Sequence, residues 1–288
     1  MKNPVLTIPP CIVCGNTCHL KFKKYGFDIF QCHKCKLGFV YPIPSKNQLS
    51  DLYITTNYYN SNTNLGYHAD SYNNLENSLK KTYRSLPKKF PKQSYNRILD
   101  VGCAYTYFSD VAKEILNPKE IFCLDLTKEA EEATQKKGYN FIKGFIEDIN
   151  IKKQHFDLIF IGDCFEHVRD PIQVTKKLSE ILAPNGIIVI TTVDFDSLFA
   201  RFFGSDWRLL SPPEHLYYWT PNSLTQLFQK VQFEGIISNY WLYYPKTYTL
   251  QHFKKQFGFH LPFSFILPSQ HIPIWSFDVM LGIFKKCL

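Results

Sequence analysis

Hydrophobic positions are spaced differently in different parts of the chain. From residue 96 onward, short apolar runs alternate with stretches in which apolar residues recur every three to four positions. The short runs predict buried strands, and the wider spacing predicts amphipathic helices. Alternation of the two predicts an α/β fold with a doubly wound, mostly parallel sheet and helices on both faces.

The predicted elements of this region follow one another closely. Strands are expected at residues 97–103, 120–126, 140–143, 155–162 and 186–193, and helices at residues 109–116, 128–137 and 170–183. Ligands of such sheets bind beyond the carboxyl ends of the strands, near the point where the strand order reverses. The residues that follow each strand are therefore the first candidates for a functional site.

The chain before residue 96 has a different pattern. Residues 46–64 are polar and rich in asparagine and tyrosine, and a helix is predicted over residues 70–86, where Pro87 ends it. We therefore expect a front module at residues 1–45, a linker and helical lead-in at residues 46–95, and an α/β domain at residues 96–288. Within that domain, an insert at residues 194–220 and an aromatic-rich tail segment at residues 246–275 fall outside the alternation.

Composition excludes several classes of protein. Hydrophobic residues make up 45% of the 288 residues and charged residues 20%, which is typical of a globular chain. Apolar runs of about 18 residues, which predict membrane spans, are missing, and the first residues lack the apolar stretch of a signal peptide. We expect a cytoplasmic protein whose nine cysteines are thiols or metal ligands.

The net charge raises the question of nucleic-acid binding. Lysine and arginine outnumber aspartate and glutamate by 33 to 25, and a basic chain attracts phosphates. The lysines, however, are scattered as pairs, and arginine, which contacts bases in a bidentate manner, is scarce. A solvated surface is the favoured interpretation, and nucleic acid is not expected as a partner.

Four cysteines form two Cys-x-x-Cys pairs, Cys11 with Cys14 and Cys32 with Cys35. Each pair turns tightly enough to place two sulfur atoms on one ion, and the separation of the pairs is typical of tetrahedral zinc ligation. The residues between them suit a hairpin of short strands, with Gly26 available for the turn. We predict a small zinc ribbon whose structural Zn²⁺ replaces a hydrophobic core and has no open position for chemistry.

Acidic residues end or follow the predicted strands at one edge of the sheet. They are Asp100, Asp125, the pair Glu147 and Asp148, and Asp163. A carboxylate that ends the second strand can accept hydrogen bonds from both hydroxyls of a ribose. The turn after Asp100 contains Gly102 and leads into a helix N-terminus, which suits close approach of a ligand carboxylate.

Together with these residues, the segments LDVGCAYTYF, FDLIFIGDCFEHVRDP and LAPNGIIVITT resemble class I S-adenosylmethionine-dependent methyltransferases. The cysteine pairs, the NYY segment and SDWRLLSPPEHLYYWTPNSLTQLF resemble more narrowly a bacterial subgroup with an N-terminal zinc ribbon, the type 23-like methyltransferases. Members of that subgroup often accompany polysaccharide and natural-product biosynthesis. The resemblance implies a seven-stranded Rossmann-like sheet in which residues 236–244 and 278–285 form an antiparallel edge.

The resemblance also implies where S-adenosylmethionine binds. Its methionine moiety would lie against Asp100, Gly102 and the turn backbone of Cys103 and Ala104. Asp125, with Leu126 beside it, would hold the ribose, and Ile146, Glu147 and Asp148 would border the adenine. Asp163 would lie beside the sulfonium, and Tyr59 of the NYY segment would close over the cofactor.

The turn departs from the family pattern D-x-G-x-G-x-G, because Ala104 and Thr106 replace its second and third glycines. Where such positions need a positive φ, alanine costs about 1 kcal/mol and a β-branched residue costs more. We expect the single methyl group of Ala104 to be tolerated and Thr106 to be the less comfortable of the two. A weakened or lost cofactor site is the alternative.

A hydroxyl acceptor needs a base to take its proton while the methyl group is displaced in line. His167, which follows the fourth strand, and His215, in the SPPEHL segment, are the candidates, because histidine titrates near neutrality. Glu166 and Glu214 could orient an imidazole or bind the acceptor. The structural alternatives are that His167 caps a helix and that His215 anchors a loop.

The insert and the tail segment carry many aromatic residues. Those at residues 195–208 recur at helical spacing and predict an amphipathic helix, which either packs on the sheet or covers the acceptor as a lid. The tail segment lacks a clear period. It is compatible with irregular cover or with peripheral membrane contact toward a lipid-linked acceptor.

The expected function is O-methylation of a sugar or polysaccharide precursor or another small-molecule acceptor. An RNA methyltransferase that holds nucleic acid with the ribbon is one alternative, but the fourth strand ends in GDCF instead of the (N/D)PP(Y/F) expected for base amines. A non-catalytic binding protein that retained the fold is another. A dehydrogenase is disfavoured, because the turn lacks GxGxxG.

Overall fold

The computed structural model describes residues 8–54, 72–151, 153, 155–242 and 276–287. Its large sheet has seven strands, in the spatial order β10 (Phe233–Leu242), β11 (Ser276–Lys286), β8 (Leu182–Val193), β7 (Phe156–Gly162), β4 (Arg97–Val101), β5 (Glu120–Asp125) and β6 (Asn140–Lys143). The pairings β10–β11 and β11–β8 are antiparallel, and the others are parallel. The predicted Rossmann-like sheet with its antiparallel edge is confirmed, and its strand order reverses between β4 and β7.

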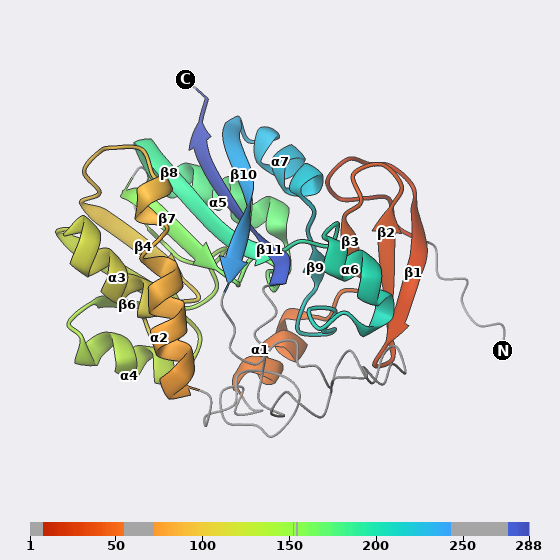
Figure 1. Cartoon of the computed structure of the whole chain (residues 1–288), viewed down its shortest axis with the longest axis horizontal. Coiled ribbons are helices and arrows are strands. Elements are labelled where there is room, and N and C mark those ends of the chain that lie inside the picture. The colour runs from red at the N-terminus through yellow and green to blue at the C-terminus, as the bar shows by residue number, and fades with distance from the viewer. Residues whose placement is uncertain (1–7, 55–71, 152, 154, 243–275, 288) are drawn as a thin grey trace, which may run out of the picture.

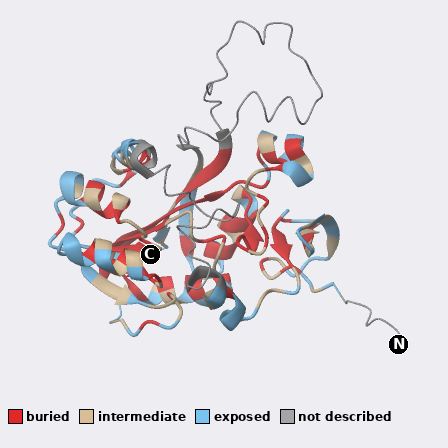
Figure 2. Ribbon diagram, turned by 90° about the horizontal axis from the view of Figure 1, so that it is seen from below, coloured by how far each residue is buried: buried red, intermediate tan, exposed pale blue. Residues whose placement is uncertain are grey.

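Helices cover both faces of this sheet, because successive buried residues of each strand point to opposite faces. Ile98 of β4 packs in a cluster with residues of α2 (Tyr72–Tyr83) and α3 (Tyr107–Leu116). Leu99, the next residue, packs in a cluster with residues of α5 (Pro171–Ile181) and α7 (Pro221–Gln229). A further helix, α4 (Lys128–Lys136), packs Ala130 against Ile121 and Cys123 of β5. Figure 2 shows the resulting band of buried residues along the central strands.

The front of the chain forms a second, four-stranded sheet at the other side of the molecule from α3 and α4 (Figure 1). Strands β1 (Cys18–Lys24) and β2 (Phe27–Cys32) are antiparallel and are joined at Tyr25 and Gly26. Both turn residues have a positive φ, 51° and 81°, as the right-handed twist of a hairpin favours. The predicted hairpin with Gly26 in its turn is therefore present.

The remaining strands of the small sheet come from two distant parts of the chain. Strand β3 (Gly38–Val40) pairs with β2, and β9 (Tyr217–Tyr218) pairs with β3. Strand β9 belongs to the insert after β8, so the insert adds an edge strand to the ribbon. Just beyond it, the hydroxyl of Thr220 donates a hydrogen bond to the carbonyl of Cys35 (2.9 Å).

A helix that the sequence did not predict follows the ribbon strand β3 along the chain and precedes the first strand of the large sheet. Residues 46–54, expected to be linker, form α1 (Lys46–Ile54). Ser45 and Gln48 exchange side chain-to-backbone hydrogen bonds of 2.8 and 3.3 Å, which is a capping box. Leu49 is buried in the main core. Among the side chains of α1 that the structure describes, Leu49 is the buried one, so the polar composition concealed this helix.

The predicted helix of the insert is present as α6 (Leu198–Phe203), followed by the short 3-10 helix η3 (Gly204–Asp206). It packs through Ala200 and Phe203, whereas Leu198 is 78% exposed. Another 3-10 helix, η2 (Pro87–Lys89), follows α2. No helix in the described part of the chain is long and apolar enough to cross a membrane.

Candidate active site

A cavity of about 230 Å³ lies beyond the carboxyl ends of β4, β5 and β7, where the strand order reverses. Most of its wall consists of the segments that follow those strands and β6, at residues 100–105, 124–127, 144–147, 162–164 and 167–169. The cavity therefore brings together nine of the predicted cofactor-binding residues, namely Asp100, Gly102, Cys103, Ala104, Asp125, Leu126, Ile146, Glu147 and Asp163. Side chains of α1, α2 and α3 complete the wall.

Asp100 lies in the wall but is almost fully buried. The hydroxyl of Ser109 in α3 donates a hydrogen bond to its Oδ2 atom (2.7 Å). Burial raises the pKa of Asp100 from 3.8 to about 7, because the charged form loses its hydration. Asp100 thus joins β4 to α3 beneath the cavity, in addition to lining it.

The turn between β4 and α3 has three residues with a positive φ: Gly102 at 69°, Ala104 at 45° and Thr106 at 62°. A Cβ atom on Gly102 would lie 2.8 Å from the sulfur of Cys164, so another residue would have to displace Cys164 and would be strained at this φ. The two positions without glycine do adopt the left-handed conformation that the family pattern requires.

Lys137, which sequence reasoning missed, supports this turn. Its Nζ atom donates hydrogen bonds to the carbonyl of Tyr105 (3.0 Å), the hydroxyl of Thr106 (2.8 Å) and Asp110 (2.8 Å). These contacts give the buried Thr106 hydroxyl a charged partner and so offset part of the conformational cost of its backbone.

Asp125 at the end of β5 lines the cavity and organises the loops around it. Its Oδ1 atom accepts hydrogen bonds from the N–H groups of Leu126 (2.8 Å) and Thr127 (3.0 Å), and its Oδ2 atom accepts one from Ala104 (3.1 Å). The hydroxyl of Thr127 donates a further one (2.8 Å). Because a carboxylate has about four acceptor sites, a ribose hydroxyl at Asp125 would share or displace one of these donors.

The segment after β6 divides the predicted adenine-binding residues. Ile146 and Glu147 line the cavity, but Asp148 does not. Asp148 is instead paired with Lys46 of α1, which itself lines the cavity and was not predicted. Burial raises the pKa of Glu147 above its ordinary value.

Asp163 and Cys164 follow β7 at the wall of the cavity. Asp163 has a φ of 47°, and its backbone N–H donates to the carbonyl of Thr191 in β8 (2.9 Å). The hydroxyl of Thr191 donates to Oδ1 of Asp163 (3.1 Å). Burial raises the pKa of the Cys164 thiol, and a hydrogen bond with Cys123 together with burial raises the pKa of Cys103, so both thiols are neutral.

Glu166, His167 and His215 lie together next to the cavity, although they come from segments about 50 residues apart. One ligand-type atom of each lies within 4.8 Å of the others, and the two imidazole rings meet edge to face with their centroids 4.8 Å apart. His167 lines the cavity, whereas Glu166 and His215 do not. The three residues proposed from sequence for proton transfer thus form one cluster.

Each member of this cluster is held by a neighbour. Nδ1 of His167 lies 2.7 Å from the carbonyl oxygen of Glu214, and Nδ1 of His215 lies 2.8 Å from that of Leu209. The hydroxyl of Thr192 donates to Oε2 of Glu166 (2.7 Å). Burial raises the pKa of Glu166 to about 7, and burial together with His167 lowers the pKa of His215. His215 is therefore neutral at neutral pH.

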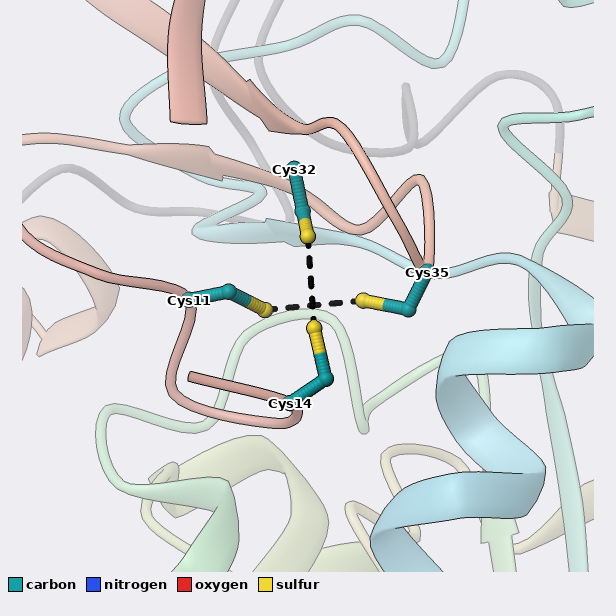
Figure 3. A group of neighbouring side chains, drawn as sticks. All are labelled: Cys11, Cys14, Cys32 and Cys35. Carbon is teal, nitrogen blue, oxygen red and sulfur yellow. Dashed lines mark hydrogen bonds between the residues drawn. The ribbon is translucent and has the colours of Figure 1, made fainter. Parts of the chain in front are cut away.

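The second cluster of metal-ligand residues is the cysteine quartet, whose four sulfur atoms point toward one another (Figure 3). The sulfurs of Cys11 and Cys35 are 3.5 Å apart, and those of Cys14 and Cys32 are 3.4 Å apart. Four thiolates at about 2.3 Å from a tetrahedral zinc ion would lie about 3.8 Å apart, so the arrangement is compatible with zinc.

Two predicted features lie outside the described residues: Tyr59 of the NYY segment and the tail segment at 246–275.

The strand order and the acidic cavity at its reversal define a Rossmann-like, nucleoside-binding methyltransferase fold. A family model described as a methyltransferase domain matches residues 74–238, more than half of the chain, and the chain belongs to this family of S-adenosylmethionine-dependent enzymes. Solved structures agree on the fold. A methyltransferase from Archaeoglobus fulgidus superposes with a TM-score of 0.53 at 16% identity, over 73% of this chain and 94% of that one.

Curated relatives are similar over shorter stretches. A malonyl-[acyl-carrier protein] O-methyltransferase from Calditerrivibrio nitroreducens is 31% identical over 36% of this chain and 41% of its own length. A mitochondrial ubiquinone biosynthesis O-methyltransferase from Dictyostelium discoideum is 26% identical over 53% of this chain and 56% of its own. The chain thus spans about half the length of the curated relatives that it matches.

Proposed function

We propose that the protein transfers the methyl group of S-adenosylmethionine to an oxygen atom of a small-molecule acceptor. The observation that carries this proposal is the position of His167, which lines the same cavity as the acidic strand ends and is backed by Glu166 and His215. The curated relatives are named as O-methyltransferases, which supports oxygen as the acceptor atom. The subgroup resemblance supports a sugar or polysaccharide precursor as the acceptor.

The residues of the cavity divide the work of such a reaction. Asp125 and its loop would hold the ribose, Ile146 and Glu147 would border the adenine, and the turn at residues 102–104 would receive the methionine moiety. S-Adenosylmethionine supplies the activated methyl group. The acceptor O–H bond breaks as the new O–C bond forms, and Nε2 of His167 takes the proton, because its Nδ1 faces a carbonyl oxygen and so carries hydrogen.

We further propose that the cysteine quartet holds one structural zinc ion. It would fix the ribbon to which β9 is paired, and β9 begins two residues after His215 in the insert. With four protein ligands, this ion would bind no acceptor.

Two measurements test the methyltransferase proposal. Calorimetric titration with S-adenosylmethionine should give micromolar binding that Asp125→Ala abolishes, whereas Glu120→Ala, an exposed acid on the same strand, should leave it unchanged. Transfer of a radiolabelled methyl group to a panel of hydroxylated sugars and small molecules should fall by about 10²–10⁴ in His167→Gln, with cofactor binding retained. Labelling of RNA instead of these acceptors would contradict the proposal.

A further inference from the structure

We propose that Glu166, His167 and His215 form a second metal site, which takes a divalent transition-metal ion. Two imidazoles and one carboxylate are a ligand set that binds Zn²⁺ and related divalent ions. Binding of the ion is independent of the proposed function, but the role of the ion toward an acceptor rests on that function.

The positions of the three ligand atoms suit one ion. They lie within 4.8 Å of one another, the same limit that the cysteine sulfurs meet. Nitrogen and oxygen atoms about 2.1 Å from a tetrahedral ion lie about 3.4 Å apart. The cluster therefore has to contract by at most about 1.4 Å, which small side-chain rotations supply.

The tautomers of the histidines also suit an ion. Because a carbonyl oxygen only accepts hydrogen bonds, the Nδ1 atoms of His167 and His215 carry hydrogen, and in the neutral rings the Nε2 atoms carry the lone pairs. Metal-binding histidines nearly always donate their other N–H to a carbonyl or carboxylate in this way. The hydroxyl of Thr192 orients Glu166 in the same manner.

The burial of Glu166 favours a positive ion beside its carboxylate. The side chain of Glu166 is 2% exposed, and no lysine or arginine in the described ranges forms an ion pair with it. A buried carboxylate without a lysine or arginine partner is costly to ionise, so it stays protonated or is balanced by another cation. A divalent ion would supply that charge and displace the proton.

The site would lie at the wall of the cavity, since His167 belongs to both. Three protein ligands leave a position for an exchangeable ligand on a four-coordinate ion. In the ion-bound protein, Nε2 of His167 would be a ligand and could not act as the base; the ion would instead bind the acceptor oxygen, or a water molecule that it replaces, and make the acceptor O–H acidic enough to release its proton to water. The ribbon site, in contrast, has four protein ligands and no such position.

Titration of the zinc-loaded full-length protein with Co²⁺, without S-adenosylmethionine or acceptor, tests the site. We expect one additional ion per chain, bound with micromolar affinity and without the thiolate-to-cobalt charge-transfer band that exchange at the cysteine quartet would produce. Glu166→Gln and His215→Gln should weaken this binding at least tenfold while retaining the ribbon zinc. His155→Gln, which removes a histidine outside the cluster, should bind as the wild type does.

The wild-type titration alone decides the question if a variant does not fold. No uptake beyond the ribbon ion at millimolar Co²⁺, or equal uptake by Glu166→Gln, would overturn the proposal and leave a hydrogen-bonded proton-transfer cluster. Because the titration involves no methyl transfer, its failure is distinct from failure of the proposed function.

Discussion

Two non-glycine residues in the turn between β4 and α3, Ala104 and Thr106, have a positive φ, and this backbone conformation lowers the stability of the protein. Ala104 has a φ of 45°, where an alanine is less stable than a glycine. Ala104→Gly should therefore raise the free energy of unfolding by about 0.5–1 kcal/mol, measured by urea unfolding. Ala112→Gly, inside α3, should lower it by about 1 kcal/mol or more. A destabilising Ala104→Gly would show that the methyl group contributes packing that outweighs the strain.

The buried carboxyl of Asp100 should make stability depend on pH. Its pKa of about 7 in the folded protein lies above the ordinary value of 3.8. The folded state therefore binds more protons than the unfolded state between these values, and the stability contributed by this group falls as pH rises from about 4 to about 7. Glu166, at about 7, and Asp194, at about 6, act in the same direction.

Asp100→Asn isolates this effect, because the amide can still accept from Ser109 and does not ionise. Urea unfolding between pH 4 and pH 7 should show a slope that is shallower in the variant by up to about 1.4 kcal/mol per pH unit. Identical slopes would mean that Asp100 is ionised in the folded protein.

At the scale of residues, the sequence indicated which residues lie at the strand ends of the site, but it did not indicate their hydrogen-bond partners. Asp125 was expected to present its carboxylate to a ribose, yet four protein donors already contact it. Lys137 was unpredictable, because it lies 31 positions from the threonine that it supports. Hydrogen bonds between residues far apart in the sequence depend on the directions of their side chains in the folded protein, and a local sequence pattern does not predict those directions.

At the scale of elements, one buried anion fastens the insert to the sheet. Asp278 of β11 accepts hydrogen bonds from Nε1 of Trp207 (3.0 Å) and from Nη2 of Arg208 (3.1 Å), and its side chain is fully buried. Removing it leaves two donors and a partly buried cation without this partner, which is costly because a buried pair has already lost its hydration.

Asp278→Ala should accordingly lower the free energy of unfolding by about 3 kcal/mol. Glu234→Ala provides the matched control, since Glu234 pairs with Lys285 across the adjacent strands and both are about 60% exposed. That change should cost less than about 1 kcal/mol. Equal losses in calorimetric or urea unfolding would argue against the anchor.

The elements that sequence reasoning missed are short ones. Helix α1 begins at a capping box and buries Leu49, and β9 has two residues. Strand β9 is too short for a period to be detected, and the polar residues around Leu49 conceal α1. Strand β7 and helix α5 begin and end within two residues of their predicted bounds, whereas β8 begins four residues before its predicted start at residue 186.

At the scale of the whole molecule, the ribbon and the large sheet share one core. Leu37 and Phe39 of the ribbon belong to the same buried cluster as Leu99 of β4 and Trp219 of the insert. Such a shared core predicts a single cooperative unfolding transition, in which loss of zinc destabilises the entire chain.

Cys35→Ser should therefore lose the zinc ion and lower the single Tm by at least about 5 °C. Cys18→Ser changes a nearby thiol that lies outside the quartet, and it should keep both the zinc and a Tm within about 2 °C of the wild type. Metal analysis and scanning calorimetry measure the two quantities. Two separate transitions, of which only the smaller responds to zinc, would contradict a shared core.

The sequence by itself determined the α/β alternation, the cysteine pairs and the acidic strand ends, whereas the number of seven strands followed from the family resemblance. These features are local, because periodicity, turn residues and spacing act over a few neighbouring positions. The tertiary structure alone decided that β9 joins the ribbon, that Asp148 turns away to Lys46, and that Glu166, His167 and His215 meet. Those contacts arise where loops from separate strands converge at one sheet edge, and the packing of the whole chain determines how close they come.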